Sequence, residues 1–230
     1  MVSRMRQKLL FTLFLYFFNI PTGVSYTHTI TSVGQEVSWR GSVHLNLVGN
    51  ANNKSGVSSD YFYSSVVKGL QRWKEASDAK VNFDYWQGSS SEYQTKREYN
   101  SYSNLYFASE SDDENSLDSS VVGLTEIWFD SDSGEIFEVD IILNDIDYNF
   151  TSDHSDTSGY GSSSRSVGYK QDVFIDNVIT HELGHAFGLG HSGELQSSMF
   201  FLESPQQAHL SCDEIAGIQS LYSENDSFGS

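Results

Sequence analysis

Residues 180–199 read THELGHAFGLGHSGELQSSM, and this stretch carries the most specific pattern in the chain. His181, Glu182, His185 and His191 stand at the spacing HExxHxxGxxH, and Met199 follows the last histidine by eight residues. Imidazole nitrogens are ordinary zinc ligands, and a glutamate beside the first histidine is the residue type expected for a general base. The stretch therefore predicts one catalytic zinc ion.

The spacing of these residues explains why they would act on one ion. On a helix, His181 and His185 lie one turn apart on the same face, so both rings can reach one metal. Glu182 is rotated by about 100° from His181, so it sits beside the ion rather than on it. Gly188 suits the chain reversal that brings His191 back, because glycine accepts positive φ at little steric cost.

Three neutral histidines leave one tetrahedral position of a zinc ion open, which is typical of a catalytic site rather than a structural one. Zinc lowers the pKa of bound water to about 7 and polarises a carbonyl group. Glu182 would accept the water proton and return it to a departing nitrogen. The expected reaction is hydrolysis of a peptide bond.

The first 25 residues are typical of a secretory signal peptide. A basic start up to Lys8 precedes an apolar run from Leu9 to Phe18, and small residues follow up to Ser25. We expect cleavage after Ser25, which would make the protein secreted, or periplasmic in a Gram-negative bacterium. A retained anchor is the alternative, but the apolar run is short for a membrane span. No stable membrane anchor is therefore expected.

The remaining chain is expected to hold one domain of residues 37–223, after a short N-terminal segment of residues 26–36 and before a tail of residues 224–230. The full sequence of 230 residues carries a formal net charge of −18, which argues against nucleic acid or an anionic membrane as partner. Cys212 is the single cysteine, so an intramolecular disulfide is excluded. The carboxylates of residues 109–120 either hold calcium or form a solvated loop, and both readings stay open.

Hydrophobic periodicity predicts the order of the elements on either side of the motif. Alternating or apolar runs predict strands, stripes at helical spacing predict helices, and residues 144–168 are expected to be a loop. The expected strands are residues 37–48, 81–85, 105–108, 121–129 and 136–143, and the expected helices are residues 60–79, 172–187 with Asp172 as N-cap, and one after a capping box of Ser211 and Glu214. This order predicts an α/β (α+β) domain with its cleft at one sheet edge.

With these residues in view, the chain resembles the metzincin zinc metallopeptidases, and within them the matrixins of peptidase family M10, especially compact bacterial members. Ser192 after the third histidine, the distance to Met199, and residues 134–144 and 210–222 carry the resemblance. It implies a zincin-like fold with a twisted five-stranded, mostly parallel sheet, an antiparallel edge strand, an active-site helix and a C-terminal helix. The polypeptide substrate would bind in extended form along residues 121–129.

The resemblance also implies roles for residues around the zinc. Met199 would form a floor below the histidines, and Phe200, Phe201 and Leu202 would wall the specificity pocket. The second, structural zinc of the family needs histidines before the catalytic helix, where this chain has His28, His44 and His154 far apart. We read these three as surface residues. Cys212 lies after the site, so latency through a propeptide cysteine is not expected.

The leading hypothesis is a secreted, monomeric, zinc-dependent endopeptidase (EC 3.4.24.-). A self-cleaving or narrow processing protease would share the site and differ in substrate range. A catalytically silent zinc- or calcium-binding extracellular module is the alternative of another class. The presence of Glu182 favours an enzyme, because a silent module has no chemical need for that base.

Overall fold

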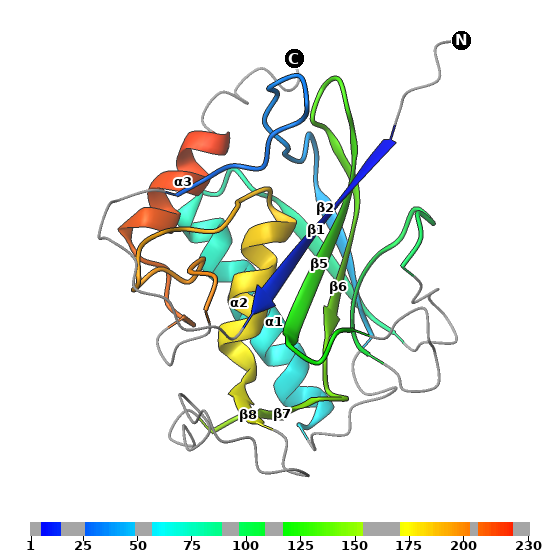
Figure 1. Ribbon diagram of the computed structural model, residues 1–230, viewed down its shortest axis with the longest axis vertical. Helices are drawn as coiled ribbons and strands as arrows, with labels where there is room; N and C mark the ends of the chain where they lie inside the picture. Colours follow the sequence, from blue (N-terminus) through cyan, green and yellow to red (C-terminus); the bar gives the residue numbers. More distant parts are fainter. Residues whose placement is uncertain are drawn as a thin grey trace.

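The computed structural model describes residues 6–14, 26–48, 57–88, 97–108, 117–153, 171–202 and 207–222, with only the backbone described for residues 6–14. Most strands follow one another between the first helix and the last two helices (Figure 1). In order they are β1 (Arg6–Phe14), β2 (Val43–Val48), α1 (Ser59–Ala76), β3 (Phe83–Gln87), β4 (Ser103–Phe107), β5 (Val121–Asp130), β6 (Ile136–Leu143), β7 (Tyr148–Thr151), β8 (Gln171–Phe174), α2 (Ile175–Ala186) and α3 (Cys212–Tyr222).

The main sheet has the strand order β1-β5-β6-β4-β2-β3. Strands β6, β4, β2 and β3 run parallel, and β5 pairs antiparallel with β6. Strands β5, β6, β4, β2 and β3 therefore form the predicted five-stranded, mostly parallel sheet with one antiparallel strand, and β1 adds a sixth strand beside β5. β7 and β8 form a separate two-stranded parallel sheet.

The N-terminal strand changes one expectation. Residues 121–129 were predicted to be the open edge of the sheet, but β1 pairs antiparallel along the outer side of β5. Leu9 lies opposite Ile127, and Thr12 lies opposite Leu124. The apolar run of the N-terminus is compatible with an extended strand, and its backbone supplies the hydrogen-bond partners that an edge strand lacks. In the full chain, β5 is therefore covered on both sides.

Helices α1, α2 and α3 lie together on one side of the sheet (Figure 1). The predicted stripe of α1 is confirmed, since Phe62, Val66, Leu70 and Trp73 are all fully buried in the core. Ser58 caps the start of this helix by accepting a hydrogen bond from the N–H of Tyr61. The helix ends at Ala76 rather than at residue 79, because the next turn leaves helical geometry.

The start of the motif helix was predicted wrongly. Asp172 belongs to β8, and α2 begins at Ile175 without a side-chain cap at Phe174. The expected loop of residues 144–168 also contains a strand, β7, which pairs with β8. The small sheet leads directly into α2, since β8 ends at Phe174 and α2 begins at Ile175. The predicted core stripe of the helix is confirmed, because its apolar residues are buried.

The capping box of α3 is present. Glu214 accepts a hydrogen bond from the N–H of Ser211 at 2.5 Å, and the Ser211 hydroxyl accepts one from the N–H of Asp213 at 3.2 Å. Ile218 and Tyr222 are buried, which confirms the predicted inner side of this helix. Among the residues that the structure describes, no helix is both long enough and apolar enough to span a bilayer.

The sheet face opposite the helices carries a row of buried polar side chains. Asn46, Asn104, Asp140 and Glu126 are register partners on four neighbouring strands, so they point to the same face. Asn46 donates to Asn104 at 3.3 Å, and Asn104 donates to Asp140 at 3.1 Å. Burial, with the nearby charges of Glu138 and Glu126, raises the pKa of Asp140 well above its ordinary value.

Candidate metal centre

The three motif histidines converge on one point. Helix α2 supplies His181 and His185, and the loop after the helix returns His191 to them. The Nε2 atom of His185 lies 3.0 Å from Nε2 of His181 and 3.2 Å from Nε2 of His191. Within the described ranges, this is the one group of three or more His, Cys, Asp or Glu side chains close enough to share a metal ion.

The partners of the other ring nitrogens decide which nitrogen carries the proton. Nδ1 of His181 lies 2.6 Å from the carbonyl oxygen of Ser198, and Nδ1 of His185 lies 2.8 Å from that of Leu189. A carbonyl oxygen only accepts, so both Nδ1 atoms are the donors and both Nε2 atoms carry lone pairs. Burial keeps the rings neutral, because it lowers the pKa of His181 to about 3 and that of His191 to about 4.

Lone pairs that face one another at 3.0 Å repel unless a cation lies between them. Two nitrogens on a tetrahedral zinc ion, each about 2.0–2.1 Å from it, are roughly 3.3 Å apart. The separations between His181, His185 and His191 are close to this value, and the donors are the neutral imidazoles that zinc prefers. The residues present therefore fit one zinc ion.

The reversal after α2 depends on a close contact with the N-terminal segment. Gly188 has φ of +98°, and a Cβ atom there would lie 2.0 Å from the carbonyl oxygen of Val37. Thr27 holds the next part of the loop, since its carbonyl accepts from the N–H of Gly190 and its hydroxyl donates to the carbonyl of His191 at 2.7 Å. Sequence reasoning missed Thr27, because nothing local links residue 27 to residue 191.

Glu182 lies beside the histidines and is fully buried against β5. The hydroxyl of Thr125 donates to its Oε2 atom at 2.5 Å. Burial raises the pKa of Glu182 to about 8, and the hydrogen bond from Thr125 partly offsets this rise. Thr125 was also missed, because the sequence alone does not show which residue of the strand faces the helix.

Met199 lies directly below α2. A Cβ atom at Gly184, the residue before His185, would be 2.3 Å from the Met199 sulfur, so the helix packs on this side chain without space to spare. The carbonyl of Met199 accepts a hydrogen bond from the N–H of Ser192 at 2.8 Å, which ties the methionine turn to the residue after the third histidine. Met199 is 2% exposed.

Two acidic residues of α3 bind the segment after His191 and the segment around Met199. Sequence reasoning assigned no such role to either residue. Asp213 accepts from the Ser192 hydroxyl at 2.6 Å. Glu214 accepts from the N–H of Met199 at 3.2 Å and from the hydroxyl of Ser197. The terminal helix therefore fixes the two segments that carry the third histidine and the methionine.

The proposed pocket residues follow Met199. Phe200 is buried, whereas Phe201 and Leu202 are partly exposed. The ring of Phe201 lies 6.4 Å from the ring of His191 and 4.7 Å from that of Phe200, measured between centroids. An apolar surface therefore lies next to the third histidine.

The other predicted positions lie away from this centre. His28 contacts Glu36 and the carbonyl of Gly217, and its side chain is mostly buried, so the expectation of a surface residue is wrong for it. His44 is exposed, as expected, and stacks on Trp86. His154 and residues 109–116 of the acidic loop lie outside the described residues, so the expected surface position of His154 and the choice between bound calcium and a solvated loop stay predictions.

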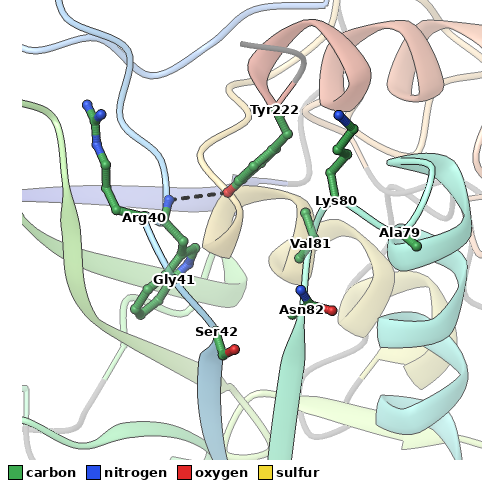
Figure 2. A pocket seen from close by; sticks show the side chains of 9 residues that line it. Arg40, Gly41, Ser42, Ala79, Lys80, Val81, Asn82 and Tyr222 are labelled. Atoms are coloured by element: carbon green, nitrogen blue, oxygen red, sulfur yellow. Dashed lines mark hydrogen bonds between the residues drawn. The ribbon is translucent and has the colours of Figure 1, made fainter. Parts of the chain in front are cut away.

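A cavity of about 370 Å³ lies near the C-terminal end of α2, between residues 39–42, residues 79–82 and Tyr222 (Figure 2). Tyr222 accepts from the N–H of Trp39 at 3.3 Å and donates to the carbonyl of Phe187 at 2.9 Å. The Trp39 indole donates to the carbonyl of Ala186 at 2.8 Å. The cavity wall thus anchors the C-terminal end of the helix just before the Gly188 reversal.

The chain is similar to known metalloproteinases over part of its length. The chain is 38% identical over 58 residues to Metalloendoproteinase 4-MMP of Arabidopsis thaliana, covering 24% of this chain and 17% of that protein. It is 40% identical over 74 residues to human Matrix metalloproteinase-26, covering 31% and 26%. The matched stretches thus span about a quarter or less of these relatives.

A solved structure, metalloproteinase-II from Bacteroides fragilis, aligns with a TM-score of 0.41 and 13% identity over 85% of this chain and 56% of that one. The Matrixin family model matches residues 43–223, which include the helix α2 histidines, the returning His191 and the Met199 turn. On this match, the chain belongs to the matrixin family of metallopeptidases.

Proposed function

We propose that this protein is a zinc-dependent endopeptidase whose general base is Glu182. The observation that carries the proposal is the convergence of three neutral imidazole Nε2 atoms beside one buried carboxyl group. Structural zinc sites use up all four positions with protein ligands, whereas this centre offers three. The matrixin relatives named as endoproteinases support the same reaction class.

His181, His185 and His191 would hold the ion, and zinc bound there supplies Lewis acidity toward water and toward a substrate carbonyl. Glu182 accepts a proton from the attacking water as the water oxygen forms a bond to the carbonyl carbon. Glu182 then passes the proton to the amide nitrogen as the carbon–nitrogen bond breaks, so its own charge is restored. Burial of Glu182 suits this cycle, because a raised pKa brings the carboxyl close to the pH at which it must both take and give a proton.

We infer that the substrate is an extended polypeptide bound along β5. Strand addition would supply main-chain hydrogen bonds, and a side-chain pocket near Phe201 and Leu202 would favour an apolar residue. The outer side of β5 already accepts a strand in this chain, since β1 pairs there in antiparallel register. That pairing supports β5 as a strand-binding edge.

We propose further that residues 1–25 are a signal peptide and that the mature protein is secreted or periplasmic. Removal at Ser25 would take away β1 and leave the outer side of β5 open to substrate. It would also leave intact the segment that contacts the loop carrying His191. Thr27 contacts this loop, and the N–H of Tyr26 donates to Asp213 at 3.0 Å. The catalytic domain then corresponds to residues 37–223, with residues 26–36 as its N-terminal brace.

The test uses residues 26–230, casein as substrate and a chelator. We expect zinc to bind in a one-to-one ratio, casein cleavage to stop on chelation, and zinc to restore it. Glu182→Gln should keep zinc and lose about 10²- to 10⁴-fold in kcat, while the exposed Glu75→Gln on α1 serves as the matched control. Zinc binding without cleavage of any denatured protein would refute the peptidase and favour a silent zinc-binding module.

A further inference from the structure

The general base touches β5 through two residues that the reaction scheme above does not use. We propose that Thr125 and Gly123 fix the orientation of the Glu182 carboxyl group, so that Oε2 is anchored and Oε1 handles the proton. This inference rests on the proposed peptidase function. Thr125 is a positioning residue in this view, because it contacts the base and not the substrate.

The hydrogen bond from Thr125 is directed at one oxygen. Its hydroxyl lies 2.5 Å from Oε2 of Glu182 and 3.2 Å from the backbone carbonyl oxygen of the same residue. A hydroxyl has a single proton, and a carboxylate is a stronger acceptor than a neutral carbonyl. The shorter contact is therefore the bond that the hydroxyl makes when Glu182 is charged, and it holds Oε2.

Gly123 controls the other oxygen. It stands two residues before Thr125 on the same strand, so both positions face Glu182. A Cβ atom at Gly123 would lie 2.7 Å from Oε1 and 3.0 Å from Cγ of Glu182, and 3.0 Å from Cγ1 of Val178. Any side chain at position 123 would push the carboxyl group of Glu182 away from the β5 backbone.

The two oxygens of Glu182 therefore have different surroundings. Both are buried, but Oε1 accepts no hydrogen bond from the described part of the protein, whereas Oε2 accepts one from Thr125. A carboxyl group free to rotate would present either oxygen, and the reactive geometry would be populated only part of the time. The hydrogen bond from Thr125 removes that freedom, and the absence of a side chain at Gly123 leaves room for this one orientation.

The experiment compares Thr125→Val, Thr125→Ser and Gly123→Ala in the 26–230 protein. Valine keeps the shape and removes the donor, so kcat should fall roughly 10- to 100-fold while KM stays within about twofold. Serine keeps the donor and should restore kcat to within about threefold of wild type. Thr29→Val is the matched control, because Thr29 is also buried but its hydroxyl does not contact Glu182. All four variants should bind zinc as wild type does in a titration.

Gly123→Ala should lower kcat by a similar factor without loss of zinc, because the methyl group displaces Oε1. Wild-type kcat in Thr125→Val, or equal losses in the valine and serine variants, would overturn the inference. An inactive wild type would instead refute the proposed function. In that case, a crystal structure of zinc-loaded Thr125→Val still tests whether Thr125 anchors Glu182. A Glu182 side chain in an unchanged rotamer overturns the inference. A rotated carboxyl group supports it.

Discussion

The contact between Arg97 and Glu126 offers a sharp test of how the helix-free face of the sheet is stabilised. Glu126 is fully buried on β5, next to Thr125 in sequence, and its Oε1 accepts from Nη2 of Arg97 at 2.8 Å and from Nε at 2.9 Å. The side chain of Arg97 is 21% exposed. Arg97→Met removes the cation and keeps most of the stem, so Glu126 keeps its burial and loses these two bonds.

Breaking a buried ion pair from one side costs about 3–5 kcal/mol. Arg97 is partly solvated, which screens its share of the interaction, so we expect about 2–4 kcal/mol of lost unfolding free energy. For a domain of this size, that is a fall in Tm of roughly 4–16 °C. Urea unfolding of residues 26–230 followed by fluorescence would measure it.

The decisive variant is Arg97→Met combined with Glu126→Gln. The amide removes the buried charge that has lost Arg97, so the double variant should recover most of the stability lost in Arg97→Met. A coupling energy below about 0.5 kcal/mol, or a single variant as stable as wild type, would refute the reasoning, because either result means that the pair carries no net stabilisation.

The other predictions concern the packing of α2 on Met199, the buried carboxyl group of Asp140 and the N-terminal strand β1. Gly184→Ala should destabilise the protein by about 1–3 kcal/mol in urea unfolding, because its Cβ would overlap the Met199 sulfur; any gain, as in an ordinary helix, contradicts the packing. The raised pKa of Asp140 means that the folded state holds a proton that the unfolded state releases, so this residue's contribution to stability is lost as pH rises toward the folded pKa. Asp140→Asn should therefore gain in Tm relative to wild type between pH 4 and pH 8, and parallel Tm curves would show that the residue does not titrate in this way. A chain that keeps residues 1–25 should cleave casein more slowly than residues 26–230, because β1 covers β5; equal kcat/KM values would show that β1 does not compete with substrate.

Local patterns were enough to predict the elements that carry their own signal. The stripe of Phe62, Val66, Leu70 and Trp73 predicted α1, and the capping box of Ser211 and Glu214 predicted the start of α3. Asp172 was misread as a helix cap, because an aspartate before a helical pattern has the same local appearance whether the chain enters from a loop or from a strand. The pairing of β7 with β8 involves residues more than 20 positions apart, and no local pattern shows it.

The identity and local spacing of the proposed zinc ligands can be read from the sequence alone. His181 and His185 share a face because the helix has 3.6 residues per turn, and Gly188 is compatible with the reversal toward His191. These are properties of a short stretch, so they can be read without the fold.

Only the tertiary structure decided which distant residues complete the site. Thr125 and Gly123 reach Glu182 because β5 packs beside α2, Glu214 reaches Met199 because α3 closes over the loop, and Thr27 reaches His191 across the molecule. Such contacts depend on strand register and helix packing, which sum over the whole core, so no single stretch of sequence reveals them.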